Sequence, residues 1–385
     1  MATENNNKNL NVPNLRFPEF GGEWQNVTLS DIVTRITRKN KNNESRLPLT
    51  ISAQYGLVDQ ISFFNKVVAS ADMSNYYLLK EGEFAYNKSY SSEYPWGAIK
   101  RLDGYPQGAL SSLYICFGIN DNVDSDFLVH YFESSKWHRE VSNIAGEGAR
   151  NHGLLNIAVG DFFNTAHCIP ATSKEQQKIA AFINLITERI ATQIKIIEDL
   201  KKLKSAISKT ILIGNKFECR QITLGEVADI YQPQTIPTSW LCEKHEYDVY
   251  GANGIIGKYS KYNHETSQIC IACRGNSCGA VNYSTPKSWI TGNAMVINTD
   301  GKDVDKRYLY HLLCTINFTP LISGSGQPQI VRSPLEKMKI RLPNLTIQRN
   351  ISKVLDDIES KVEIEEEICK RFIKQKLGLL SQMFI

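Results

Sequence analysis

Two long stretches of the chain place apolar residues at alternating intervals of three and four positions, the spacing of a coiled-coil seam. The first seam consists of Ile179, Ile183, Ile186, Ile190, Gln193, Ile197, Leu200, Lys204, Ile207 and Ile211. The second consists of Ile351, Leu355, Ile358, Val362, Glu365, Cys369, Phe372, Lys376, Leu379 and Met383. Eight of ten positions are apolar in each, and the polar exceptions occupy the same two slots. Chance amphipathicity would not place the interruptions alike, so the pattern indicates an ancestral duplication.

Each seam predicts one helix of about 35–40 residues, or roughly 55–60 Å. A helix of this length cannot bury its stripe on one compact domain, so we expect the two to pack as an antiparallel coiled coil. The alternative is that each helix covers its own domain. Ser173 and Gln176 predict a capping box at the first helix. Glu365 and Lys204 are expected to pair across the helices, unless these polar side chains simply reach water.

Shorter repeats flank the helices. Thr28-Leu29 and Thr223-Leu224 lie in similar apolar-Thr-Leu-x-acid segments, and a Pro–Gln–Ile junction opens each helix. The segments between are rich in β-branched and aromatic residues with Gly, Asn, Asp and Ser punctuation, which is typical of short strands. The predicted fold class is therefore α+β, with two mixed α/β heads, two long helices and a pseudo-twofold internal repeat. The predicted boundaries are 1–21 for an N-terminal tail and leading segment, 22–172 for the first head, 173–216 for the first helix, 217–342 for the second head and 343–385 for the second helix.

Composition adds little about partners. The 385 residues suggest two or three domains, and 42% hydrophobic content excludes wholesale disorder. No apolar run reaches the length of a membrane span, and the polar start is not a signal peptide, so we expect a cytoplasmic chain whose nine cysteines are reduced. The net charge is only +4. It is concentrated on residues 173–216 at +5, whereas residues 1–172 carry −3.

Polar loops next to glycine are the candidate nucleic-acid contacts. Glycine permits close backbone approach, while Arg suits guanine and Asn or Gln suits adenine. The loop after Gly146 in the first head and the loop after Gly324 in the second occupy similar places. Their candidate residues are Arg150, Asn151 and His152 in the first head, and Gln327, Gln329 and Arg332 in the second. The alternative is an ordinary turn with a solvated arginine.

Two further sets follow predicted strands and offer mixed donors and acceptors. They are Lys88, Ser89 and Tyr90 in the first head, and Arg274, Asn276 and Ser277 in the second. Lys258 and Lys261 alternate with tyrosines, which suits a nucleic-acid backbone but equally a solvated hairpin. Exposed loops without a role are the alternative for each set.

Cysteines and histidines of the second head could form a zinc set. The residues are Cys242, His245, His264, Cys270, Cys273 and Cys278. A zinc knuckle needs its cysteine pair on a tight turn, whereas Cys270 and Cys273 lie in an alternating strand. We therefore favour buried thiols, and predict no metal and no cofactor.

In combination these features resemble the DNA-specificity (S) subunits of type I restriction–modification enzymes, the HsdS family. The resemblance covers nearly the whole chain and rests on the order of several stretches. These are Val12-Pro13-Asn-Leu15-Arg16-Phe17-Pro18-Glu19-Phe20, the two Pro–Gln–Ile junctions, Tyr250-Gly251-Ala-Asn253-Gly254 and Gly324-Ser-Gly326-Gln327-Pro328. None is specific alone.

The resemblance implies two target-recognition domains that read the halves of a bipartite double-stranded DNA site. It also implies a non-catalytic subunit that docks two methyltransferase (M) subunits and, through the complex, restriction (R) subunits, with no membrane partner. We find no amino-methylation motif and no glycine-rich cofactor loop, in agreement with that division of labour. The weak charge suggests that partner subunits supply much of the phosphate contact. A coiled-coil scaffold with two protein-binding heads is the main alternative; a self-sufficient enzyme is disfavoured. The target bases cannot be deduced.

Overall fold

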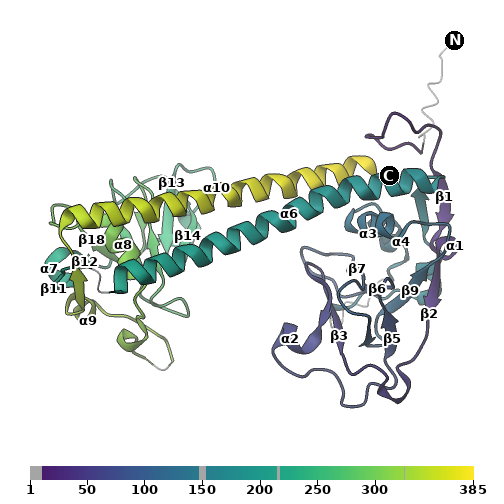
Figure 1. The fold of residues 1–385 in the computed structure, drawn as a ribbon, viewed down its shortest axis with the longest axis horizontal. Helices are drawn as coiled ribbons and strands as arrows, with labels where there is room; N and C mark the ends of the chain where they lie inside the picture. Colours follow the sequence, from purple (N-terminus) through teal and green to yellow (C-terminus); the bar gives the residue numbers. More distant parts are fainter. Residues whose placement is uncertain (1–10, 147–152, 215–216, 325) are drawn as a thin grey trace, which may run out of the picture. The chain divides into compact units, whose positions relative to one another are not determined.

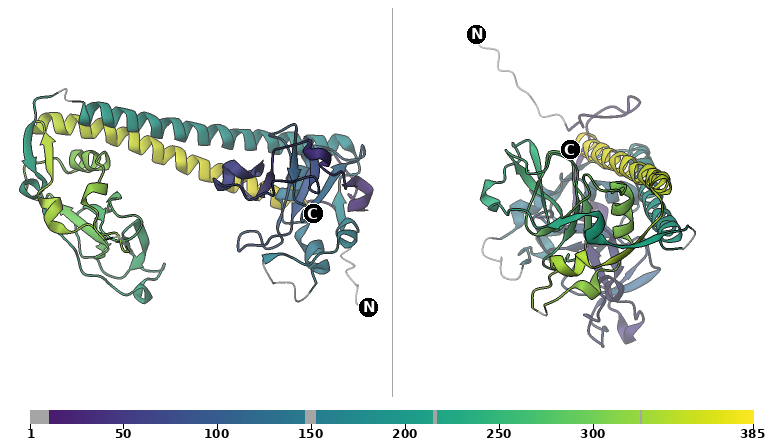
Figure 2. Two further views of the ribbon diagram at one scale, coloured as in Figure 1. Left: turned by 90° about the horizontal axis from the view of Figure 1, so that it is seen from below. Right: turned by 90° about the vertical axis from the view of Figure 1, so that its left-hand side faces the viewer.

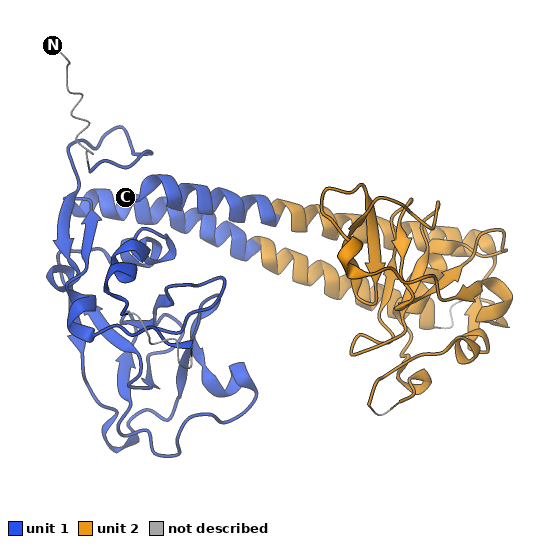
Figure 3. Cartoon of the chain, turned by 180° about the vertical axis from the view of Figure 1, so that it is seen from behind, with its two compact units in different colours: residues 1–192, 369–385 blue, residues 193–368 orange. Residues whose placement is uncertain are grey.

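The computed structural model of the chain describes residues 11–146, 153–214, 217–324 and 326–385. These residues form two compact units, residues 1–192 with 369–385 and residues 193–368 (Figure 3). Each unit contains one head and a segment of both long helices, because the division passes through the helices. The domain boundaries drawn from the sequence stay a prediction, since compactness groups each head with helix segments.

The two long helices are α6 (Ser173–Ser208) and α10 (Leu345–Met383), which pack antiparallel (Figure 1). All twenty seam positions predicted from the heptads are buried or half-buried, so the predicted seam is confirmed. A π-helical turn, Lys209–Ile213, continues α6. No helix among the residues that the structure describes is long and apolar enough to cross a lipid bilayer.

The repeated Thr-Leu motif begins each head with the same local structure. Strand β1 (Gln25–Thr28) runs into α1 (Leu29–Ile32), and β11 (Arg220–Thr223) runs into α7 (Leu224–Val227). The acid three residues after each threonine accepts from its backbone amide over 2.7 Å, completing a capping box. Strands β1 and β11 pair antiparallel with β10 (Ala166–Ile169) and β19 (Lys339–Leu342), which lead into the long helices.

Each head contains a four-stranded sheet with the same strand order. In the first head the order is β2 (Val33–Ile36), β9 (Ile115–Ile119), β6 (Phe84–Asn87) and β7 (Ala98–Arg101). In the second head the order is β12 (Asp229–Tyr231), β18 (Ala294–Asn298), β15 (Ile269–Ala272) and β16 (Val281–Tyr283). One helix follows the β9 or β18 strand in each, α3 (Ser125–Glu133) and α8 (Lys306–Cys314). The duplication therefore extends into the heads.

The heads differ in what is inserted between the first strand and the central strand of this sheet. The first head inserts β3 (Leu49–Ser52), β4 (Gly56–Asp59), α2 (Gln60–Phe64) and β5 (Tyr77–Lys80), the last paired with β8 (Gln107–Leu110). The second head carries a three-stranded sheet of β14 (Gly254–Tyr259), β13 (Tyr247–Gly251) and β17 (Trp289–Ile290). The remaining short helices are α4 (His138–Ile144), α5 (Val159–Phe163) and α9 (Arg332–Glu336).

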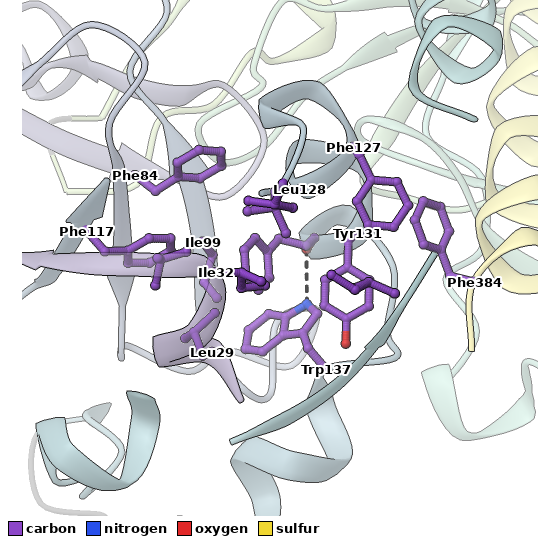
Figure 4. Packing of buried hydrophobic residues seen from close by; sticks show 14 of the residues in the cluster. Leu29, Ile32, Phe84, Ile99, Phe117, Phe127, Leu128, Tyr131, Trp137 and Phe384 are labelled. Atoms are coloured by element: carbon purple, nitrogen blue, oxygen red, sulfur yellow. Dashed lines mark hydrogen bonds between the residues drawn. The ribbon is translucent and has the colours of Figure 1, made fainter. Parts of the chain in front are cut away.

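Buried aromatic side chains make up much of the core of the first unit (Figure 4). Phe84 stacks on Phe117 at 5.5 Å, while Phe384, just after α10, contacts Phe127 at 5.4 Å between ring centroids. Trp137 donates its indole N–H to the Phe132 carbonyl at 3.1 Å, so this buried polar group is satisfied. Residues from near both ends of the chain therefore complete one core.

Gln176 does not act as the predicted capping-box residue of the first long helix. The Gln176 side chain is buried, donates to the Pro170 carbonyl at 3.0 Å and accepts from the Asp124 amide at 2.8 Å. In the second unit Gln348 bonds the Pro343 carbonyl at 2.8 Å and the Asp305 amide at 2.9 Å. Asp124 and Asp305 are the N-caps of α3 and α8, so each glutamine fastens a head helix to the start of a long helix.

Candidate nucleic-acid interface

One candidate segment of the first head, residues 88–90, is held by backbone pairing to residues 153–155. Residues 88–90 follow β6, and Ser89 forms an antiparallel bridge with Leu154. Two amide-to-carbonyl hydrogen bonds flank the bridge, from Leu155 to Lys88 over 2.9 Å and from Tyr90 to Gly153 over 3.0 Å. The strand end is therefore held against the chain that follows the first glycine loop.

The second head repeats this arrangement at the end of β15. Arg274 forms an antiparallel bridge with Gln329. The flanking bonds run from Ile330 to Cys273 over 3.1 Å and from Gly275 to Pro328 over 3.0 Å. We call these two pairings the loop bridges. In the second head two candidates that are far apart in the sequence, Arg274 and Gln329, thus lie side by side, while in the first head the candidate Ser89 lies beside Leu154 at the same position of a related sheet.

Backbone geometry explains the glycines of the second loop bridge. Gly275 has φ of 78° and Gly324 has φ of 89°, a region that favours glycine. A Cβ on Gly324 would also lie 2.6 Å from the Gln327 carbonyl oxygen. The glycines therefore permit the tight path of the candidate loop.

Most candidate side chains in the described residues face solvent. The exposed ones are Ser89, Tyr90, Arg274, Asn276, Gln327, Gln329 and Arg332, and the half-buried ones are Lys88 and Ser277. Arg150, Asn151 and His152 lie outside the described residues. The hydroxyl, amide and guanidinium groups around the loop bridges can donate to and accept from base edges and phosphates.

The other basic candidates are placed differently. Lys258 lies on β14 and Lys261 just after it, whereas Arg274 follows β15 of a different sheet. Lys258 lies 3.5 Å from the Asp248 carboxylate, whereas Lys261 is exposed. Arg332 begins α9 and forms an ion pair with Glu336 at 2.6 Å. A phosphate would have to compete with these carboxylates at Lys258 and Arg332.

Two of the four candidate zinc cysteines of the second head are core residues, whereas Cys242 is exposed and Cys278 is half-buried. Cys270 and Cys273 are buried, and burial raises the pKa of both thiols, that of Cys270 to about 12. Metal ligation needs the thiolate, which this environment disfavours. Among the described residues, the one group of three possible metal ligands within 4.8 Å is His311, Asp356 and Glu359, which includes none of the candidate zinc residues.

The polar residues of the two helix seams have partners that the sequence did not predict. The amide of Gln193 donates to the carboxylate of Glu365, so the pairing of Glu365 with Lys204 is wrong. Lys204 instead lies 2.8 Å from Glu359, and Lys376 lies 2.9 Å from Glu133 of the first head. Only the middle polar slot, Gln193 in one copy and Glu365 in the other, faces its equivalent in the antiparallel pair. The lysine slots do not face each other.

A network missed by the sequence analysis joins each head helix to a long helix. His130 bonds Asn184 at 2.7 Å, and at the equivalent place His311 bonds Asp356 at 2.7 Å. The sequence did contain a signal for this network: Asn184 and Asp356 occupy equivalent positions when the two seams are superimposed. Neither histidine belongs to an apolar repeat, so periodicity alone did not reveal them.

The fold and the loop bridges define the class of this protein: a duplicated chain in which two unlike β-rich heads share one antiparallel helix pair. Residues 218–371 match the family described as "Type I restriction modification DNA specificity domain". A Haemophilus influenzae protein named a type I restriction enzyme specificity subunit is 32% identical over 151 residues, 38% of either chain. The EcoprrI specificity subunit of Escherichia coli is 26% identical over 161 residues, 40% of either chain. The matched segments thus span about two-fifths of these relatives.

Longer matches extend the likeness to the rest of the chain. The MjaX specificity subunit of Methanocaldococcus jannaschii is 21% identical and covers 97% of this chain and 96% of its own length. The S subunit of a type I restriction–modification system from M. genitalium has a TM-score of 0.63, 15% identity and coverage of 97% and 99%, a likeness of fold. The chain is thus similar over nearly its whole length to type I restriction–modification specificity (S) subunits, and its residues 218–371 match the specificity-domain family.

Proposed function

We propose that this chain is the DNA specificity subunit of a type I restriction–modification complex, in which each head reads one half of a bipartite double-stranded site. The repeated loop bridge carries the proposal. Two heads with different inserts keep the same backbone pairing at a sheet-strand end that carries exposed polar side chains, as a chain with two similar reading heads requires. The family match over the second head supports DNA as the ligand.

Arginine-to-alanine substitution at the second loop bridge tests this function. Arg274→Ala should weaken binding to the cognate site by about tenfold or more, because one base-directed arginine contributes about 1–3 kcal/mol. The complex with its methyltransferase subunits would be titrated with duplexes that vary one half-site at a time. Discrimination should fall at one half-site only.

The control for this substitution is Lys353→Ala, an exposed cation on α10 outside the loops. Its removal should leave half-site discrimination unchanged. Equal loss of affinity for all sequences in Arg274→Ala would assign Arg274 to the phosphate backbone. A wild-type complex that binds no duplex in a salt-dependent way would contradict the proposed function itself.

The proposed assembly contains two methyltransferase (M) subunits, with restriction (R) subunits joining through the complex, and acts in the cytoplasm where its DNA lies. The mass of the purified complex measures this stoichiometry. A single M subunit per chain at saturation would contradict the two-subunit arrangement while leaving DNA reading intact.

A further inference from the structure

The first head exposes an unusual group of large apolar side chains on its insert. They lie on the β3–β4 hairpin, on α2 and in the segment after it. Their exposed fractions are 72% for Tyr55, 44% for Phe63, 45% for Phe64, 73% for Val67 and 52% for Val68. The rings of Tyr55 and Phe63 are 6.5 Å apart and those of Phe63 and Phe64 are 5.0 Å apart. We call Tyr55, Phe63 and Phe64 the aromatic cluster.

The opposite side of the same element is well packed. Leu49, Ile51 and Leu57 of the hairpin are buried in a local core. Asp59 caps α2 by accepting from the Ile61 amide at 3.0 Å, and Asn65 ends the helix with φ of 50°. The aromatic cluster is therefore displayed by an ordered hairpin and helix whose apolar interior is already filled.

The charge of this region differs from that of the rest of the head. Residues 37–83, which lie between β2 and β6, carry six basic and five acidic side chains, whereas the remainder of residues 1–172 carries nine basic and thirteen acidic ones. Lys41, Arg46 and Lys66 are exposed, and within the described residues none of them has an ion-pair partner. The insert thus carries a net charge of +1 on an otherwise acidic head, and it displays these three exposed cations.

The equivalent insert of the second head lacks this combination. Residues 232–268 carry three basic and four acidic side chains, although Trp240 and Ile255 are exposed there. Within the first unit, α2 lies on the side of the head away from α6 and α10 (Figures 1 and 2). The insert of the first head is therefore separate from the helix surfaces of its own unit.

We propose that the aromatic cluster is a second DNA-binding element of the first head, which presses its rings against a base step while Lys41, Arg46 and Lys66 contact phosphates. The inference rests on the proposed function and adds to it. Apolar wedges with neighbouring cations unstack and bend duplex DNA at deformable steps. Because the second insert is not basic, the duplex is deformed beside the half-site of the first head only.

A fluorescence scan tests the proposal. The complex with its methyltransferase subunits would be titrated with cognate duplexes that carry 2-aminopurine at successive positions in and beside each half-site. Wild type should raise the fluorescence at one step beside the first half-site. Phe63→Ala with Phe64→Ala should abolish this rise and weaken binding by about tenfold, as expected for one lost base-stacking contact. Phe63→Leu with Phe64→Leu keeps an apolar wedge and should retain most of the signal.

The charged side of the element has its own test. Arg46→Gln with Lys66→Gln should reduce the slope of log affinity against log salt by about two, since each phosphate contact contributes about 0.9. Lys80→Gln, an exposed lysine on β5, is the matched control and should leave the slope in place.

Three outcomes overturn the inference. In the first, the alanine pair binds and bends DNA as wild type does. In the second, the pair loses methyltransferase subunits but keeps normal DNA binding once reassembled, which assigns the aromatic cluster to a protein partner. In the third, the pair changes only self-association. Each of these leaves half-site discrimination by Arg274 intact, so it is distinct from failure of the proposed function.

Discussion

The two head–helix junctions place a histidine at the same point and surround it with different charges. In the first unit, His130 meets the neutral amide of Asn184, which also donates to Asp126 at 3.2 Å. In the second unit, His311 meets the carboxylate of Asp356, and Arg307 stands where Asp126 stands in the first. The contact between the histidine and the long helix is therefore the same in both units, whereas the residues around it carry different charges.

This difference makes the second junction the more ionic one. Burial opposes the charge of Arg307, but hydrogen bonds and attraction from Asp356 and Glu359 outweigh it and raise the pKa of Arg307. Burial also lowers the pKa of His311, so the histidine is held neutral. Asp356 and Glu359 are balanced by Arg307 and Lys204, which leaves little reason for a metal ion at this acidic group.

The largest expected effect comes from removing the central carboxylate. Asp356→Ala leaves Arg307 without its main partner in a half-buried place and should lower the free energy of opening α8 by about 3 kcal/mol. Asn184→Ala removes a neutral hydrogen bond and should cost α3 only about 1 kcal/mol. Hydrogen exchange of the two helices in the full chain measures both. Asp357→Asn changes an exposed neighbour and is the control. Equal losses of opening free energy for α3 and α8 would contradict the difference between the two junctions.

Acid should distinguish the junctions through Glu133. Burial would raise the pKa of Glu133, but bonds from His130 and Lys376 lower it from 4.5 to about 2. The ionised form is therefore stabilised by folding, so this stabilisation is present above about pH 4.5 and is lost as the pH falls towards 2. In Glu133→Gln the exchange of α3 should lose this pH dependence. The exchange of α8, which carries Cys314 at the equivalent place, should be unaffected; an unchanged α3 profile would refute the role of Glu133.

The smallest effect concerns the middle of the helix pair, where equivalent slots of the two copies meet. Gln193→Glu places a second carboxylate against Glu365 and should destabilise the pair by about 1 kcal/mol above neutral pH, and less in acid. Thr192→Glu adds the same charge at an exposed neighbouring position and serves as the control. Urea unfolding of the full chain compares the two, and equal effects would mean that the crossing register is not sensitive to charge.

The predictable features were those encoded in one continuous segment. Heptad spacing revealed α6 and α10, and the alternating strand expected around Cys270 corresponds to β15. The register of two helices cannot be read from either helix alone, which is why Lys204 was paired with the wrong residue. Gln176 was likewise assigned to its own helix because its actual partner, Asp124, is supplied by the head.

The candidate site divides in the same way. Residues 88–90 and 274–277 could be selected because they follow strands and carry polar groups. Their backbone pairing with Leu154 and Gln329 depends on how distant segments meet in the sheet, which no local pattern contains. The aromatic cluster was missed because exposed and buried phenylalanines look alike in a sequence.

The path of the chain through the first unit has a consequence for its synthesis. Residues 369–385, including Phe384 of the first core, are translated only after the whole of residues 193–368. Domains usually fold in order as they leave the ribosome. Here the first head must wait with an incomplete core while the second unit is made, so the nascent chain exposes apolar surface over that interval.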